Sequence, residues 1–438
     1  HSFAGCNDYD KKELSGIKSN NLGLVTAYND MLSAHRVYEN YPDKFRGYAK
    51  KHNAVVQVAG GVPAMCDGVT QGQDGMELSL FSRDVIALST SVALSHNVFD
   101  AVLCLGICDK IVPGLMIGSL KFGHLPIVFV PGGPMPTGIS NDEKAKIRRD
   151  FAEGNISREQ LLKGESDSYH SPGTCTFYGT ANSNQMLMEI MGMQLPGSSF
   201  VNPDTNHRKL LNEKAVEIAN KNASNGLTHS ISRIIDEKSI VNGIVGLLAT
   251  GGSTNHTIHL IAIARAAGII INWEDMSSLS EVTPLITRMY PNGAADVNHF
   301  HASGGMPYVI NTLLSNGLLH NDVTTIIGQN LEDYTKESKI KNDELIFTKG
   351  AQKSLNKNVI RSVSDPFLSK GGIRILKGNI GRSVIKTAAV DEVNLIVEAP
   401  AIVFMEQSQM IKAFQDNELD KDFIAVIPFQ GPRQNGMP

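Results

Sequence analysis

A short segment of the chain, Leu105–Gly114, places a thiol, a carboxylate and an amine side by side. Cys108, Asp109 and Lys110 follow an apolar run and precede a Pro-Gly turn. Open α/β sheets bind their ligands at the carboxyl ends of strands, so this is a position for a functional site. Thiolates prefer iron–sulfur clusters, zinc or copper, whereas carboxylates prefer magnesium or manganese, so the Cys-Asp pair suits two different metals better than one. The alternative interpretation is a partly buried cysteine beside an Asp–Lys ion pair.

A second Cys-Asp pair, Cys66-Asp67, lies in the glycine-spaced segment Met65–Gly75, ahead of a predicted helix. Glycine-rich loops let backbone amides approach an anion, and Asp67 is a candidate second ligand for a hard cation. A plain connector in which Asp67 caps a turn explains the same residues. A third cysteine, Cys175, lies in Ser171–Asn182, before a methionine-rich stretch whose side chains we expect to fill the core.

The segment Gly251–Asn255 is a candidate binding site for a carboxylate or phosphate group. It follows an apolar run, Ile244–Leu248, that we interpret as a strand, and it opens an apolar helix. Backbone amides are free at a helix N-terminus, and Ser253, Thr254 and Asn255 add polar side chains there. A simple Ser/Thr N-cap explains the same residues, and the lysine of a P-loop is absent.

Four other polar residues are weaker candidates. His256 and His259 lie three apart on the helix after that segment, but the glutamate of H-E-x-x-H is missing, which favours a core or surface role. His35 and Arg36 end a polar stretch, Asn29–Arg36, that follows another predicted strand. We therefore treat His35 and Arg36 as possible substrate contacts.

Short apolar runs alternate with helix-sized stretches such as Leu78–Ser95. This alternation predicts a large three-layer α/β domain with a mostly parallel sheet, over residues 1–364. The charged segment Ser140–Lys163 is predicted to form solvated helices. The predicted strands are Leu22–Ala27, Val55–Ala59, Ala101–Ile107 and Pro126–Val130.

After Ser364 the sequence changes to short β-rich runs punctuated by glycine, which predicts a β-rich, barrel-like C-terminal domain over residues 365–438. The last residues, 431–438, are turn-rich, and we expect the sequence to end inside this domain, which would then be truncated. The predicted strands are Ile373–Leu376, Ser383–Thr387, Asn394–Val397, Ala401–Phe404 and Phe423–Ile427.

Composition excludes several classes of protein. The chain has 438 residues, 42% hydrophobic and 19% charged, with a net charge of -4, which argues against disorder and against a nucleic-acid or anionic-membrane partner. It has no apolar run long enough to span a bilayer, and its five cysteines do not resemble a disulfide framework, so we expect a soluble, cytoplasmic protein. C-x-x-C, G-x-S-x-G and G-x-G-x-x-G motifs are absent. Scattered thiols beside aspartates favour an incompletely ligated iron–sulfur cluster next to a divalent cation.

The chain resembles the dihydroxy-acid and phosphogluconate dehydratase family over essentially its whole length, most closely the phosphorylated sugar-acid branch. The stretches that carry the resemblance are VTAYNDMLSAH (25–35), QVAGGVPAMCDGVTQGQDGMELSLFSRDVIA (57–87), LGICDKIVPGL (105–115), SPGTCTFYGTANSNQM (171–186), GMQLPGSS (192–199), VNGIVGLLATGGSTNHTIHL (241–260) and INWEDMSSLS (271–280).

The resemblance implies a set of cofactor ligands. Cys108 and Cys175 would bind an iron–sulfur cluster, and Asp67, Asp109 and Lys110 would surround Mg²⁺, with Lys110 carbamylated so that it offers oxygen. Asp109 and Lys110 would thereby take part in catalysis. A 4Fe-4S cluster is expected rather than 2Fe-2S.

Two departures from the family pattern affect this assignment. Sugar-acid members carry a third cluster cysteine where this chain has Ala34, so Cys66 is the substitute candidate. The family's further metal-binding glutamate and its serine base are expected in segments after Pro438, outside this sequence.

The activity implied by the resemblance is dehydration of 6-phospho-D-gluconate to 2-dehydro-3-deoxy-6-phospho-D-gluconate by a homodimeric hydro-lyase. The alternative within the family is a dihydroxy-acid dehydratase or another sugar-acid dehydratase. The alternative outside it is a non-enzymatic iron–sulfur protein, which would not need Asp67 or Lys110.

Overall fold

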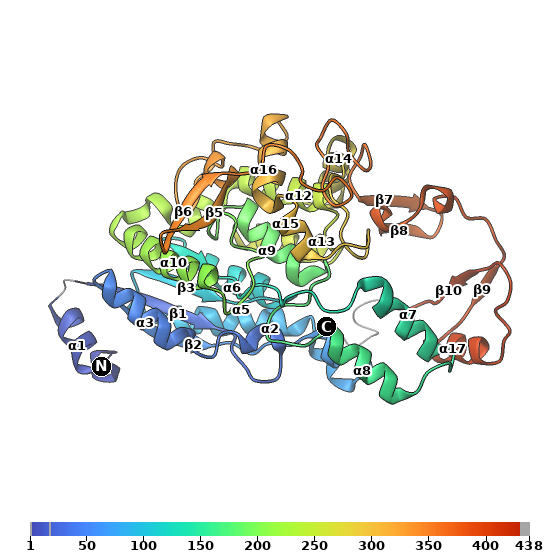
Figure 1. Cartoon of the computed structure of the whole chain (residues 1–438), viewed down its shortest axis with the longest axis horizontal. Coiled ribbons are helices and arrows are strands. Elements are labelled where there is room, and N and C mark those ends of the chain that lie inside the picture. The colour runs from blue at the N-terminus through green and yellow to red at the C-terminus, as the bar shows by residue number, and fades with distance from the viewer. Residues whose placement is uncertain (1, 17–18, 430–438) are drawn as a thin grey trace.

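The centre of the molecule is a parallel four-stranded sheet, seen in a computed structural model that describes residues 2–16 and 19–429 (Figure 1). Its strands are β1 (Asn20–Thr26), β2 (Ala54–Gly61), β3 (Ala101–Leu105) and β4 (Ile127–Phe129), in the order β2-β1-β3-β4. Leu22 of β1 pairs with Val56 on one side and Ala101 on the other. The four predicted strands of this domain and their parallel arrangement are confirmed.

Helices cover both faces of this sheet. Helix α3 (Tyr41–Lys51) packs on β2 and on α10 (Asn206–Ser224), which also crosses β1, β3 and β4. On the opposite face α5 (Phe81–Leu94) packs on β1 and β2, with α6 (Ile111–Leu120) beside it, as right-handed β-α-β crossovers require. Strand β3 is apolar throughout because both of its faces are buried. These layers confirm the predicted α/β class.

Helices α5 and α6 approach each other closely at two glycines of α6. A Cβ atom at Gly118 would lie 2.6 Å from the carbonyl oxygen of Ala87 and 2.7 Å from Cβ of Thr90. A Cβ atom at Gly114 would lie 2.8 Å from the carbonyl oxygen of Arg83. No real Cβ atom packs at such distances, so the separation of the two helices depends on both glycines.

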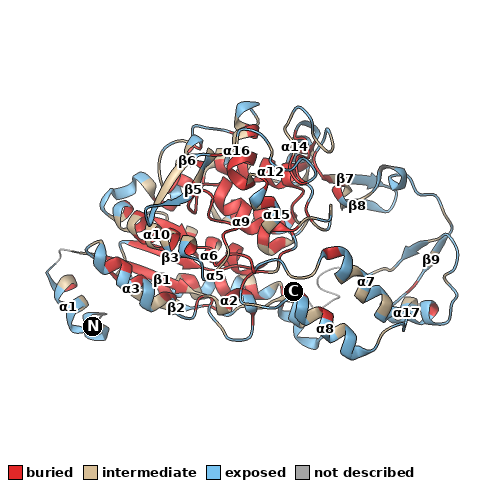
Figure 2. Cartoon of the chain, in the orientation of Figure 1, coloured by how far each residue is buried: buried red, intermediate tan, exposed pale blue. Residues whose placement is uncertain are grey.

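A layer of buried helices lies above the sheet in Figure 1 and forms the second large buried region in Figure 2. One of them, α12 (Glu237–Thr250), corrects a prediction, because the predicted strand Ile244–Leu248 lies inside this helix. Burial on all sides removes the periodicity that separates a helix from a strand. The signals for the helix are at its ends, a capping box at Asp236 and a left-handed Gly251.

The predicted solvated helices are confirmed. Helices α7 (Asn141–Ala152) and α8 (Arg158–Ser168) are mostly exposed and extend to the right of the core in Figure 2. Ser140 and Ser157 accept hydrogen bonds from backbone amides of the first turns, which explains where the helices begin.

The C-terminal part contains short strands in separate pairs. β7 (Ile373–Gly378) and β8 (Gly381–Lys386) are antiparallel, whereas β9 (Ala401–Val403) and β10 (Ile424–Val426) are parallel. The predicted strand Asn394–Val397 is wrong, because this segment has no partner strand among the described residues and is exposed. The described strands do not close into a barrel. Residues 431–438 lie outside the described part of the chain.

The remaining elements connect these layers. No helix in the described ranges is long and apolar enough to cross a membrane. The other elements are α1 (Asp8–Ser15), α2 (Ser33–Arg36), α4 (Asp67–Thr70), α9 (Thr180–Ile190), α11 (Ile231–Ile234), α13 (His256–Ala266), α14 (Trp273–Val282), α15 (Val297–Ala302), α16 (Gly305–Ser315), β5 (Lys336–Lys341), β6 (Glu344–Lys349) and α17 (Gln407–Gln415).

The close approach of α5 and α6 predicts opposite effects for two glycine-to-alanine substitutions. Gly118→Ala is expected to lower the free energy of unfolding by about 1–3 kcal/mol, because the added methyl group is forced against backbone. Gly47→Ala is the matched control in α3, where a Cβ atom meets nothing within 4 Å. It is expected to raise the free energy of unfolding by about 0.5–1 kcal/mol. Urea unfolding of both variants measures this, and equal effects would contradict the packing argument.

Candidate functional site

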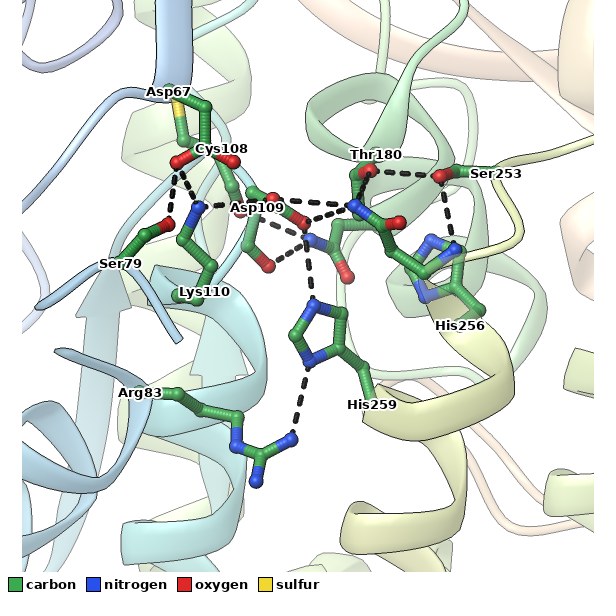
Figure 3. A network of polar contacts seen from close by, with 12 residues as sticks. Asp67, Ser79, Arg83, Cys108, Asp109, Lys110, Thr180, Ser253, His256 and His259 are labelled. Carbon is green, nitrogen blue, oxygen red and sulfur yellow. Dashed lines mark hydrogen bonds and ion pairs between the residues drawn. The ribbon is translucent and has the colours of Figure 1, made fainter. Parts of the chain in front are cut away.

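The carboxyl edge of the parallel sheet brings together the two Cys-Asp pairs. Cys66 and Asp67 follow β2, and Cys108 and Asp109 follow β3, on either side of the central strand β1. Because parallel strands all end at the same edge, residues 42 positions apart in the sequence meet there. The predicted site residues Asp67, Asp109 and Lys110 form one polar network (Figure 3).

The centre of this network is the ammonium group of Lys110, which lies between two carboxylates. Its Nζ donates to Asp67 Oδ1 and to Asp109 Oδ2, the latter at 3.0 Å, and its side chain is only 1% exposed. Burial, the largest single effect, opposes the charged form, but the two carboxylates together raise the pKa of Lys110. Ser79 Oγ also donates to Asp67 Oδ1, at 2.6 Å, and so fixes that carboxylate.

Asp109 is held from three sides. Besides Lys110, it accepts hydrogen bonds from His259 Nε2 at 3.3 Å and from Asn255 Nδ2 at 3.4 Å. Burial alone would raise the pKa of Asp109, but the hydrogen bond from His259 and the charge of Lys110 hold it well below its usual range. The carboxylate is therefore ionised at neutral pH.

Three thiols lie beside these carboxylates. Cys66 and Cys108 are hydrogen bonded to each other, and Cys175 is close enough to interact electrostatically with both. The hydrogen bond from Cys108 and the backbone amides after Asp67 lower the pKa of Cys66 to about 6, whereas burial raises the pKa of Cys175 to about 11. Cys66 therefore reaches the thiolate state most easily of the three.

The loop that carries Cys108 is strained. Cys108 has φ +75°, a left-handed conformation that is rare for residues with a Cβ atom and is concentrated at functional sites. The buried Asn184 of α9 holds the loop by donating from Nδ2 to the carbonyl oxygens of Cys108 at 2.9 Å and Asp109 at 3.0 Å. The strain orients the thiol and the carboxylate of consecutive residues.

The segment Gly251–Asn255 contributes unequally to the network. Asn255 reaches Asp109 and also donates to Thr180 Oγ1 at 3.0 Å, and Ser253 Oγ is 2.8 Å from the same Thr180 atom. Thr254 contributes its backbone carbonyl to Thr257. Of these three predicted substrate contacts, Asn255 and Ser253 therefore lie at the site, whereas the Thr254 side chain makes no hydrogen bond to it within the described part of the chain.

The other two predicted substrate contacts lie apart from this network. His35 is fully buried, and burial lowers its pKa to about 4. Arg36 forms surface ion pairs with Asp30, at 3.5 Å, and with Glu39. Neither contacts Asp67, Asp109 or Lys110 among the described residues.

Sequence reasoning missed several members of the network. His259, Asn184, Thr180 and Ser79 reach the site from helices or turns distant in sequence. The spacing of His259 from His256 is the one signal in the sequence, but without the glutamate of H-E-x-x-H it predicts a core or surface role. The histidine is indeed buried, and it also contacts Asp109.

The donor groups fit two neighbouring sites, one for a hard cation and one for an iron–sulfur cluster. Two carboxylates offer hard oxygens, and a carbamate on Lys110 would add a third in place of an opposing positive charge. In the described ranges, no three His, Cys, Asp or Glu side chains are placed so that they could hold one metal ion together. A cluster binds each thiolate through a different iron, so its ligands need not converge on one point.

This arrangement defines an α/β enzyme whose acidic and thiol groups meet at the carboxyl edge of a parallel sheet. Residues 20–334 match the description "Dihydroxy-acid/6-phosphogluconate dehydratase N-terminal", and residues 358–438 match the corresponding C-terminal description. The chain belongs to the dihydroxy-acid/6-phosphogluconate dehydratase family, whose members are hydro-lyases.

Individual relatives agree with the family assignment. The chain is 57% identical to a phosphogluconate dehydratase of Escherichia coli K12, over 100% of this chain and 73% of the relative. It is 56% identical to that of Pseudomonas aeruginosa, over 100% of this chain and 72% of the relative. A dihydroxy-acid dehydratase of Caldanaerobacter subterraneus is 31% identical, over 94% of this chain and 72% of the relative.

The buried His35 predicts a loss of stability in mild acid. Its pKa is about 4 in the folded protein and about 6.5 when exposed, so the unfolded chain binds more protons between these values. The free energy of unfolding should therefore fall as pH decreases from 6.5 to 4, by about 3 kcal/mol from this residue. His35→Phe is expected to show a smaller fall in urea unfolding at pH 7 and pH 5. An equal fall in both proteins would contradict the argument.

Proposed function

We propose that this protein dehydrates 6-phospho-D-gluconate to 2-dehydro-3-deoxy-6-phospho-D-gluconate. The observation that carries the proposal is the Asp67–Lys110–Asp109 cluster around a buried ammonium group, beside three thiols, in a chain 54–57% identical to several phosphogluconate dehydratases over its full length. The 31% identity to a dihydroxy-acid dehydratase gives the alternative substrate much weaker support.

The reaction has two difficult parts. The proton at C2 is weakly acidic because it lies next to an ionised carboxylate, and the hydroxyl at C3 is a poor leaving group. Breaking the C2–H and C3–O bonds releases water and leaves an enol, which becomes the 2-keto acid when C3 gains a proton. Such a reaction needs stabilisation of negative charge at the substrate carboxylate and assistance to the departing oxygen.

The proposed cofactors are Mg²⁺ and an iron–sulfur cluster, for which we favour 4Fe-4S. Asp67, Asp109 and carbamylated Lys110 would hold Mg²⁺, and Cys108, Cys175 and Cys66 would hold the cluster. When bound, the two would supply Lewis acidity toward the substrate carboxylate and toward the C3 hydroxyl.

Side chains around the proposed Mg²⁺ site hydrogen bond the two carboxylates. Ser79, His259 and Asn255 orient the two carboxylates before any ligand arrives, which lowers the cost of reorganisation. Asn255 and Ser253 offer polar groups to the substrate from the start of α13. The catalytic serine base stays a prediction from the family resemblance.

Other properties belong to the same proposal. We propose a homodimer, a cytoplasmic location, and a division of the chain at residues 364 and 365 into a catalytic α/β domain and a β-rich domain. Symmetric dimers are common among enzymes of this size, and the chain carries no charge pattern for nucleic acid.

The first test is anaerobic purification of the full-length protein, with iron and sulfide quantified and keto-acid formation assayed with Mg²⁺. Turnover of 6-phosphogluconate that greatly exceeds turnover of gluconate and of a dihydroxy acid is expected. Faster turnover of either alternative substrate would keep the family and overturn the proposed substrate. Absence of iron and sulfide would overturn the cluster.

Substitutions separate the two proposed cofactors. Asp109→Ala should lower kcat/KM by at least about 100-fold while iron content is retained, because one carboxylate near the cation is lost. Cys175→Ser should lower iron content together with activity.

The control is Cys104→Ala, because Cys104 is buried in β3, where its Sγ lies 3.8 Å from Ser119 Oγ. It should retain the iron content of the wild type. Full activity of Asp109→Ala would contradict the role of the carboxylate, and full iron content of Cys175→Ser would contradict that of the thiol.

A further inference from the structure

A buried histidine lies between Asp109 and an arginine that belongs to another helix. His259 of α13 has its side chain 1% exposed, with Nε2 3.3 Å from Asp109 Oδ1 and Nδ1 3.3 Å from Nη1 of Arg83 (Figure 3). Arg83 lies on α5 and Asp109 follows β3, so the chain of contacts joins three separate elements. Neither of these two contacts involves Lys110.

The contact with Arg83 determines which nitrogen of His259 carries the hydrogen. A guanidinium group only donates hydrogen bonds, so Nδ1 must accept from Arg83. The hydrogen of the ring is therefore on Nε2, which donates to Asp109 Oδ1. With Nδ1 protonated instead, two donors would face each other and Asp109 would lose a partner.

The two oxygens of Asp109 are thereby assigned to different partners. Oδ1 accepts from His259, while Oδ2 accepts from Lys110 at 3.0 Å. One contact on each oxygen restricts the rotation of the carboxylate plane, and Asn255 Nδ2 lies 3.4 Å from both oxygens.

We propose that His259, held as the Nε2–H tautomer by Arg83, is a positioning residue that orients Asp109 for binding of a divalent cation. The inference rests on the proposed function for the identity of that cation, Mg²⁺. Outer partners of this kind, which hydrogen bond a ligand without touching the ion, set both the orientation and the basicity of the ligand.

The neighbouring His256 provides a comparison within the same helix. It is also fully buried, but its Nε2 lies 2.8 Å from Ser183 Oγ, and it makes no hydrogen bond to Asp109. Its ring centroid is 6.2 Å from that of His259. Loss of either ring removes a buried imidazole from α13, but only loss of His259 should affect the carboxylate.

The test is calorimetric titration of Mg²⁺ into the holoenzyme after treatment with EDTA, for the wild type and four variants. His259→Leu removes the donor and is expected to weaken Mg²⁺ binding by about 10–100-fold. His259→Gln places an amide N–H near the position of Nε2 and should restore binding to within a few-fold of the wild type. Arg83→Met should weaken binding, and His256→Leu should leave it unchanged even if stability falls.

The outcomes separate this inference from the proposed function. Equal Mg²⁺ affinity of the wild type and His259→Leu, or equal losses for the Leu and Gln variants of His259, would overturn the positioning role. A wild type that binds no Mg²⁺ would overturn it as well. Absence of turnover with 6-phosphogluconate, together with the expected pattern of Mg²⁺ affinities, would instead overturn the substrate and leave the role of His259 intact.

Discussion

The site depends on one electrostatic constraint, the burial of a positive charge between two negative charges. An ammonium group that is almost inaccessible to water is costly unless carboxylates surround it, and the largely buried carboxylate of Asp109 is costly without a positive partner. Lys110 and Asp109 are consecutive residues after β3, but Asp67 comes from another strand, so the balance exists only in the folded sheet. A cation that binds here must therefore displace the ammonium group of Lys110 or find its charge neutralised. Only a cation that the carboxylates bind strongly can do so.

The main elements of the α/β domain could be predicted from the sequence, because buried parallel strands are short apolar runs and the segments between them are long enough for helices. The same reasoning placed Asp67, Asp109 and Cys108 at one edge, since strand ends are visible in the sequence. It failed at Ile244–Leu248, where a helix buried on all sides shows no period. It also failed at Asn394–Val397, where β-forming residues lack a partner strand among the described residues.

The rest of the site could not be predicted because it depends on tertiary contacts. Asn184 reaches the Cys108 loop from a helix, and nothing in its local sequence distinguishes it from a core amide. His35 follows a predicted strand in a polar stretch, which suggested a substrate contact, but it lies in the short helix α2 and is fully buried. His259 shows the opposite error, since it is expected in the core or on the surface but contacts the site. A buried histidine and a site histidine have the same sequence pattern. Its partner, Asp109, is 150 positions away.

The glycine contact between α5 and α6 couples the site to residues that never touch it. Helix α6 begins directly after Lys110, and α5 carries Arg83, so the distance between these helices sets how far the arginine lies from the acidic cluster. A larger side chain at Gly114 or Gly118 would shift a charged group rather than merely loosen the core. Attempts to engineer thermal stability should therefore leave this pair of helices unchanged and concentrate on exposed positions of α7 and α8 other than Lys144 and Arg148, whose charges act on the Cys175 thiol.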